Sequence, residues 1–271
     1  MAKIDLDAPA YLALLPTAAA NFWPLLSASI FLTAATIAPD LVRLPEGTSL
    51  LEAFDLSITI SLVFAWILTE TTIAFAVYPT LLTGGVIAGY TALKQAAFPR
   101  LATFMGLQFI MLLLMVVIAV LVVKTASAVG ATSPDGPIDG TQSSITTGTA
   151  LILIFLFGLA QPDVVMTGRM SLGTALRHAV QNTRALLPRL VFTAGPLWLT
   201  SEHATELSWA AGPEENGSGE ITINFVMLTY ASVVLGILGS IMAAIVLARV
   251  YRDMMPPGAL LEAGRVSGVF D

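Results

Sequence analysis

Apolar residues gather in six long stretches along the chain, and short polar segments separate them. The stretches cover residues 18–38, 56–77, 101–123, 145–165, 187–209 and 221–250. A helix needs about 20 apolar residues to cross the hydrocarbon core of a bilayer, and each stretch approaches that length. The pattern predicts an all-α, polytopic integral membrane helix bundle of about six transmembrane helices in a single membrane domain, residues 1–271.

The fifth and sixth stretches are the least regular. The most apolar part of the fifth, residues 190–199, is short and contains Pro196, and Glu202 and His203 follow it. The sixth is longer than a bilayer requires, which allows a tilted helix or an end that emerges from the membrane. Pro256-Pro257-Gly258 then ends the helix, because proline cannot continue it. Residues 253–271 are expected to form a short cytoplasmic tail.

Composition supports the membrane assignment and excludes several kinds of chemistry. Of the 271 residues, 56% are hydrophobic and 11% are charged, whereas soluble domains usually carry about 25% charge. The absence of cysteine excludes disulfides, thiolate metal sites and cysteine nucleophiles. A formal net charge of −6 argues against nucleic acid as a partner, since phosphate binding requires clustered cations.

The basic residues predict the orientation of the six spans. With six crossings, ten of the twelve Lys and Arg residues share one side: Lys3, Lys94, Arg100, Arg169, Arg177, Arg184, Arg189, Arg249, Arg252 and Arg265. Basic loops stay cytoplasmic, so both termini are expected inside the plasma membrane of a prokaryote. The other side holds Arg43, Lys124 and most of the acids. That acidity is typical of a high-salt organism such as a halophilic archaeon, and equally of ordinary acidic loops in a bacterium.

Two inner loops resemble each other. Thr83-Gly84, Gly89, Thr91–Lys94 and Pro99–Leu101 match Thr167-Gly168, Gly173, Thr174–Arg177 and Pro188–Leu190 in the same order. Each loop follows an inward span and precedes an outward one, which predicts a parallel tandem repeat over residues 56–123 and 145–209. Coincidence among Gly, Ala, Leu and Thr is the alternative.

Four polar residues fall inside predicted spans: Glu70, Gln108, Gln161 and Asp163. An acid in hydrocarbon costs about 2.5–3.5 kcal/mol on insertion scales, so Glu70 should face the bundle or a water-filled cavity. Counting residues along the helices places all four at compatible depths in the inner half. They therefore indicate either a proton or cation relay, or a polar ligand site. The structural alternative is a protonated Glu70 that holds the helices in register by hydrogen bonds.

Other positions indicate contacts with lipid, with a partner or between helices. Arg177, Arg184 and Arg189 belong to an amphipathic inner segment that suits a headgroup or a partner surface, or simply connects two spans. Small residues recur every four positions in the last span, at Ser232, Gly236, Ser240 and Ala244. Such a stripe lets helix backbones approach closely, within the bundle or in a homodimer.

Signatures of enzymes and metal sites are missing from the sequence. His178 and His203 fall on opposite sides of the membrane, and no HExxH, Walker A or GxSxG motif is present. The sequence therefore predicts neither catalytic residues nor a metal or other cofactor.

The segment Leu172–Arg177 through Thr183-Arg184, the Pro79–Gly85 turn and the Val250-Tyr251-Arg252 end of the last span carry a resemblance. Together they resemble the YciC-like six-span membrane proteins and the related membrane domain of some glycerophosphodiester phosphodiesterases. The resemblance implies a six-span architecture and no defined activity.

Two functions remain open from the sequence. The first is a non-enzymatic membrane protein that binds lipid or a protein partner and supports membrane organisation. The second is a transporter or an ABC-type permease subunit that moves a small solute or ion through a cavity at Glu70, with residues 171–187 as the coupling helix to a separate ATPase chain. A water-accessible cavity at Glu70 favours the second function, and a dry core favours the first.

Overall fold

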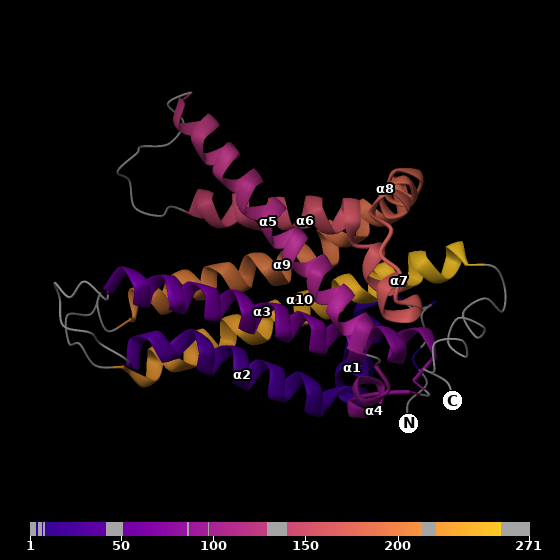
Figure 1. The fold of residues 1–271 in the computed structure, drawn as a ribbon, viewed down its shortest axis with the longest axis horizontal. Coiled ribbons are helices and arrows are strands. Elements are labelled where there is room, and N and C mark those ends of the chain that lie inside the picture. Colours follow the sequence, from indigo (N-terminus) through magenta and orange to yellow (C-terminus); the bar gives the residue numbers. More distant parts are fainter. Residues whose placement is uncertain are drawn as a thin grey trace.

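The computed structural model describes residues 4, 7, 9–41, 51–85, 87–96, 98–128, 140–212 and 221–255, and all regular structure among them is helical. The described residues form ten helices (Figure 1): α1 Ala10–Ala20, α2 Phe22–Leu41, α3 Leu51–Leu82, α4 Tyr90–Gln95, α5 Phe98–Ala128, α6 Gly140–Phe157, α7 Ala160–Thr167, α8 Leu172–Gln181, α9 Thr183–Ala210 and α10 Ile223–Met254. The fold is thus all-α, as the sequence predicts.

Helix α10 is the centre of the bundle. It packs most extensively along α9 and also contacts α1, α2 and α3. Among the remaining helices, α5 contacts α6 and α7, and α6 contacts α9. Because α10 is covered from several directions, residues 241–251 are all buried. Its long apolar sequence therefore serves helix packing, and it is also long and apolar enough to cross a membrane.

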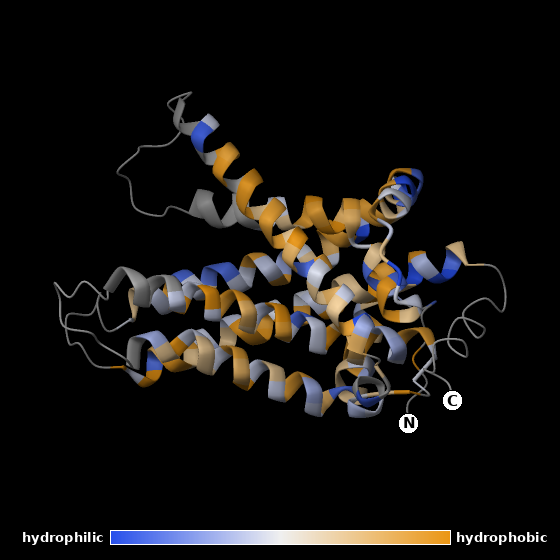
Figure 2. Cartoon of the chain, in the orientation of Figure 1, coloured by the Kyte–Doolittle hydropathy of each residue, from blue (hydrophilic) through white to orange (hydrophobic). Residues whose placement is uncertain are grey.

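Four helices are long and apolar enough to cross a membrane, and the bent pair α6–α7 makes a fifth candidate. The four stretches are Phe22–Pro39, Ser57–Leu82, Phe98–Val122 and Ile223–Met254. Helix α5 turns large apolar side chains outward, at Phe109, Leu113, Val116, Val117, Val120 and Leu121. Figure 2 shows hydrophobic residues along much of α5. Contiguous exposed apolar surface of this kind suits lipid rather than water.

Helix α9, which contains the predicted fifth span, is not among these apolar candidates. It is a continuous helix of 28 residues despite Pro188 and Pro196. Its length would suffice for a crossing, but Arg184, Arg189, Glu202 and Glu206 make it less apolar. The structure therefore supports four to five spans on apolarity, and a sixth needs a separate argument.

Two predicted spans are interrupted in the structure. The first breaks at Asn21, between α1 and α2. The buried side chain of Asn21 donates to the carbonyl of Thr17 (2.9 Å) and accepts from the amide of Gly89 (2.8 Å) and the hydroxyl of Thr80 (3.1 Å). These bonds tie the break to the end of α3 and to the loop that follows it.

The fourth predicted span bends by 53° between α6 and α7. A Cβ atom at Gly158 would lie 2.3 Å from the carbonyl oxygen of Ile154, so only glycine fits this bend. Pro162 follows in the first turn of α7, where a missing amide costs little. Gln161 and Asp163 consequently belong to a separate short helix rather than to a straight span.

The two hairpins of the predicted repeat share an element order. A long helix, a short helix and a long helix follow one another in α3–α4–α5 and again in α6/α7–α8–α9. Gly84 and Gly168, which match in the sequence, both adopt a left-handed backbone, with φ of 66° and 75°, a conformation that favours glycine. The short helices differ, since α4 has 6 residues and α8 has 10. The repeat itself stays a prediction.

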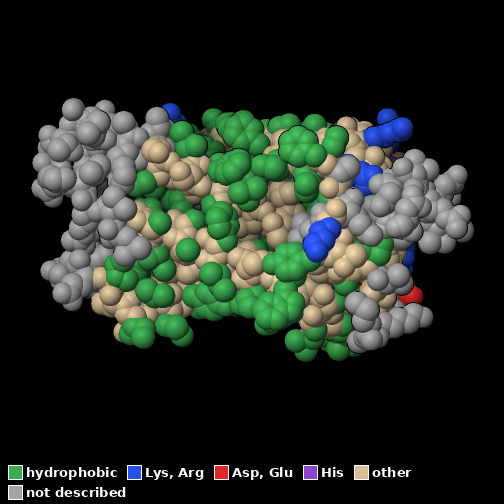
Figure 3. Space-filling model, turned by 60° about the horizontal axis from the view of Figure 1, so that its bottom comes forward, with side chains coloured by type: hydrophobic (Ala, Val, Ile, Leu, Met, Phe, Trp, Pro, Cys, Tyr) green, Lys and Arg blue, Asp and Glu red, His purple; other side chains and the backbone are tan. Residues whose placement is uncertain are grey.

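The described cations gather at one end of the bundle, apart from Lys124 at the far end of α5. We call this the cation-rich end, and it holds Lys94, Arg100, Arg169, Arg177, Arg184, Arg189, Arg249 and Arg252. Figure 3 shows most Lys and Arg side chains towards that end of a largely hydrophobic face. The contact of Gly168 with Arg100 and the ion pair of Arg252 with Asp7 (2.6 Å) tie its elements together. Lys3, Arg43, Arg265 and most of the predicted tail lie outside the described residues.

Candidate functional site

A cavity of about 480 Å³ lies among α2, α3, α5, α6, α7, α9 and α10. Its lining is mostly apolar but includes nine polar residues: Thr69, Glu70, Gln108, Thr147, Gln161, Ser201, Glu202, Ser232 and Ser240. On α10 the lining ends at Ser240, and the buried segment towards the cation-rich end begins at the next residue. The cavity therefore borders the middle of α10, and its placement in the inner half of a membrane stays a prediction.

Glu70 reaches this cavity from the middle of α3 and is partly buried. The hydroxyl of Ser240 on α10 donates a hydrogen bond of 2.9 Å to Glu70 Oε1. Ser240 is a member of the small-residue stripe, so the intramembrane acid and the stripe meet at one point. The side chain of Glu70 also borders the open volume of the cavity.

Three buried polar atoms in the lining have no hydrogen-bond partner within the described part of the chain. They are Thr69 Oγ1, Gln108 Nε2 and Thr147 Oγ1, on α3, α5 and α6. The residues are only 2%, 3% and 3% exposed. Buried polar groups are nearly always hydrogen-bonded to protein or water. Atoms of this kind around one volume indicate a space that accepts water or a polar ligand.

Gln161 and Asp163 lie two residues apart on α7 and therefore point to different sides of the helix. Gln161 lines the cavity, and its Oε1 accepts a hydrogen bond of 2.8 Å from the hydroxyl of Tyr78. Asp163 lies outside the lining and accepts hydrogen bonds from Tyr251 (3.2 Å) and Thr167 (3.3 Å). Three of the four predicted intramembrane polar residues thus share the cavity. Asp163 instead links α7 to the end of α10 through Tyr251.

The predicted headgroup arginines lie at the cation-rich end, away from the cavity. Arg177, Arg184 and Arg189 are exposed. Helix α8 turns Ala175 and Ala179 into the bundle, whereas Leu176 and Val180 stay exposed, at 38% and 61%. An exposed apolar edge beside arginines is typical of a helix at the membrane interface.

The small residues of α10 have two different surroundings. The carbonyl of Ser232 accepts a hydrogen bond of 2.9 Å from Ser201 Oγ on α9, and Gly236 lies against the same Ser201 hydroxyl. Ala244 lies in the buried segment beyond the cavity. Gly239 falls off the predicted stripe, yet it is the tightest position, because an added Cβ would lie 2.5 Å from the indole of Trp198.

The sequence reasoning did not single out Trp66, Trp198 or Glu202, although all three line the cavity. A pattern could have found them. Trp66-Ile-Leu-Thr-Glu70 and Trp198-Leu-Thr-Ser-Glu202 both read W-x-x-[ST]-E. Residues three and four apart share a helix face, so each pattern points its tryptophan, hydroxyl and acid to one side.

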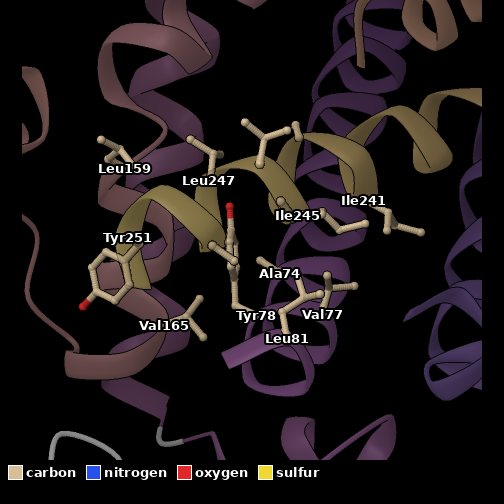
Figure 4. Packing of buried hydrophobic residues seen from close by; sticks show 14 of the residues in the cluster. Ala74, Val77, Tyr78, Leu81, Leu159, Val165, Ile241, Ile245, Leu247 and Tyr251 are labelled. Atoms are coloured by element: carbon tan, nitrogen blue, oxygen red, sulfur yellow. The ribbon is translucent and has the colours of Figure 1, made fainter. Parts of the chain in front are cut away.

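Beyond the cavity, towards the cation-rich end, the bundle is closely packed. Figure 4 shows Ile241, Ile245 and Leu247 of α10 among Val77, Tyr78 and Leu81 of α3 and Val165 of α7. Tyr78 is 1% exposed, and its hydroxyl reaches Gln161 at the boundary of the cavity. We call residues 241–251 of α10 with these partners the packed core.

Comparison with known proteins matched the chain to no family model, no curated protein and no solved structure. The likeness to the YciC-like proteins therefore stays a hypothesis. The described residues contain no group of three or more His, Cys, Asp or Glu side chains that could hold a metal ion.

Proposed function

We propose that this protein binds a small solute inside the bilayer and moves it across, as a transporter or a permease subunit. The cavity at Glu70 carries this proposal. Its volume of about 480 Å³ falls in the range of about 300–1,000 Å³ found for small-molecule sites. Its lining is mostly apolar with a minority of polar residues, as is usual in such sites. A scaffold protein would instead be expected to surround Glu70 with close packing.

The proposal includes six crossings, with α9 as the fifth span. Trp198 of α9 lies against Gly239 of α10. Thr205, further along α9, pairs with Ser232, which comes earlier in α10. Helix α9 therefore lies antiparallel along α10, which is an apolar span of 32 residues. A continuous helix of 28 residues in that position would reach across the bilayer. Its acid Glu202 can be tolerated because a protein cavity, not lipid, borders it.

The cation-rich end sets the orientation of this arrangement. Lys and Arg are retained on the cytoplasmic side of membrane proteins. We therefore assign the cation-rich end to the cytoplasm, with both termini on that side. Helix α8 would then lie at the inner interface, where its exposed Leu176 and Val180 suit lipid and Arg177 suits anionic headgroups. That placement also favours a second role in binding lipid, and it leaves α8 available to a cytoplasmic partner.

Cysteine accessibility tests the central claim, because the natural chain has no cysteine and therefore no background reaction. The informative variants are Ser240→Cys and Gln108→Cys in the cavity lining. The matched controls are Val246→Cys, which is 0% exposed on α10, and Val117→Cys on the outer face of α5. We expect a small charged thiol reagent to modify the two cavity variants and to spare both controls.

Vesicles of known orientation extend this test to transport. A transporter must expose the cavity to each side in turn, so modification of Ser240→Cys should occur from inside and from outside, at rates that a bound solute changes. Cavity variants that stay unreactive from both sides, while a cysteine in place of Arg177 on α8 reacts, would contradict transport through this cavity.

A further inference from the structure

The two W-x-x-[ST]-E patterns bring equivalent groups to the cavity from two helices. The residues are Trp66, Thr69 and Glu70 on α3, and Trp198, Ser201 and Glu202 on α9, and all six line the cavity. Helices α3 and α9 run in opposite directions, since α3 ends and α9 begins at the cation-rich end. Helix α10 lies in contact with both and contributes its small residues to the lining between them.

Contacts with α10 place Glu70 and Trp198 at one level. Ser240 donates to the carboxylate of Glu70 at 2.9 Å. The neighbouring residue, Gly239, lies directly against the indole ring of Trp198. The acid of one pattern therefore lies at the same height in the bundle as the tryptophan of the other.

The second level lies one to two turns further from the cation-rich end. Ser201, the neighbour of Glu202, donates to the carbonyl of Ser232 at 2.9 Å. Trp66 precedes Glu70 by one turn on α3, which places it about 6 Å further along the bundle in the same direction. Glu202 and Trp66 consequently border this second level. Each level of the cavity thus has one carboxylate and one indole, supplied by opposite helices.

The charge of the lining has a single sign. Glu70 and Glu202 are its ionisable groups, and no Lys, Arg or His belongs to it among the described residues. In a medium of low effective dielectric, a carboxylate attracts a cation a few ångströms away by several kcal/mol and repels an anion by as much. An indole face adds a further attraction for cations that are poorly hydrated. The carboxylates and the indoles therefore both favour a cationic ligand.

We propose that the cavity selects an organic cation that carries an apolar or aromatic group, such as a hydrophobic amine or a quaternary ammonium. This proposal rests on the proposed function and specifies its substrate class. Glu70 and Glu202 supply the compensating charge, and the indoles of Trp66 and Trp198 cover the cationic group. The flexible side chains of Met111 and Met115 in the lining adapt to the apolar part of the ligand.

The unpartnered polar atoms support a ligand rather than an empty packing defect. Thr69 Oγ1 belongs to the first pattern, and Gln108 Nε2 and Thr147 Oγ1 lie on α5 and α6 around the same volume. A metal ion would suit the cavity less well, because hard cations require six or more oxygen ligands in close array. Here two carboxylates from different helices are interleaved with indoles.

A pair of ions with the same shape and opposite charge tests the proposal directly. The full chain, purified in a nonionic detergent, is dialysed to equilibrium against tetraphenylphosphonium or tetraphenylborate. We expect saturable binding of the cation with an affinity at least about 10-fold higher than that of the anion. Equal binding of the two ions, or tighter binding of the anion, would overturn the assignment.

Paired variants locate the binding. Glu70→Gln and Glu202→Gln should each weaken cation binding by about 10-fold, or about 1.4 kcal/mol, without weakening anion binding. Glu206→Gln, one turn further along α9 and outside the lining, should change the affinity much less than either of these. An equal loss in Glu206→Gln would show a surface effect and overturn the cavity as the site.

The tryptophans provide a graded readout that a purely structural role would not produce. Trp66→Phe and Trp198→Phe should lower cation affinity less than the corresponding Leu variants, because phenylalanine retains a weaker cation–π face. Trp23→Leu and Trp209→Leu serve as controls, since these residues are 65% and 54% exposed. Equal effects of Phe and Leu, in variants that elute as the native protein does, would contradict the cation–π contact.

Binding and transport can fail separately. Charge-selective, saturable binding without flux of tetraphenylphosphonium in proteoliposomes would overturn transport and leave the cation site. Saturable uptake of an anionic or neutral solute that Ser240→Leu blocks, without cation binding, would overturn the substrate class and leave transport.

Discussion

Two adjacent segments of the apolar helix α10 differ in how closely they are packed. Residues 241–251 are buried without exception, and large side chains from α3 and α7 close around them (Figure 4). Residues 232–240 border an open volume and carry serine or glycine at three of its lining positions, Ser232, Gly236 and Ser240, beside Val233 and Ile237. The comparison shows how a bundle can hold a cavity: close packing in the packed core keeps the helices rigid where the cavity segment lacks such packing.

The largest expected effect comes from the packed core. Leu247 is 0% exposed, and Leu247→Ala should reduce the free energy of unfolding by about 2–5 kcal/mol, because a buried cavity replaces the lost side chain. Thermal or denaturant unfolding in detergent measures this loss. Val117→Ala, at a position that is 53% exposed on α5, is the matched control and should change stability by well under half as much. Equal losses would show that the packed core is not where stability resides.

An intermediate effect is expected where α9 approaches α10. Gly239→Leu must displace the indole of Trp198, since even a Cβ would lie 2.5 Å from it. We expect a destabilisation of about 1–3 kcal/mol from overpacking, together with loss of cation binding. Gly106→Leu is the control, because a Cβ there meets nothing within 4 Å. Native affinity in Gly239→Leu would mean that the position of Trp198 does not matter for the ligand.

The smallest expected effect is at the bond between the stripe and the acid. Ser240→Ala removes the donor to Glu70, and interhelical hydrogen bonds of this kind contribute about 0.6 kcal/mol on average in membranes. Stability should therefore fall only slightly, since water in the cavity can replace the hydroxyl. Ligand affinity and its pH profile should change more than unfolding does. A loss of several kcal/mol in unfolding would instead assign Glu70–Ser240 to the packed core.

Several features of the fold can be read from the sequence, and the reasons are local. The long apolar stretches correspond to α2, α3, α5, α6–α7, α9 and α10, because insertion and helix formation depend on the residues of each stretch. The bend within the fourth predicted span was not anticipated, since it depends on the contact of Gly158 with the preceding turn. The break at Asn21 could not be expected either, because its partners Thr80 and Gly89 lie far away along the chain.

Only part of the candidate site could be predicted from the sequence. The acid of Glu70 is conspicuous in an apolar stretch, whatever surrounds it. Glu202 and Trp198 are not, because they belong to the least apolar of the long stretches and resemble the polar end of a helix. Asp163 shows the opposite case, since its depth in the sequence matches that of Gln161, but two positions further along α7 it lies on another side of the helix and contacts Tyr251.

The sequence by itself determined that this is a helical protein with several stretches long and apolar enough to cross a bilayer, and it indicated which residues would be costly to bury there. Both properties follow from the length and composition of single stretches. Only the tertiary structure decided that Glu70 meets Ser240, 170 residues further along the chain, and that two W-x-x-[ST]-E patterns face one cavity. These features depend on the register and direction of helices packed against α10, which side-chain contacts between distant segments establish.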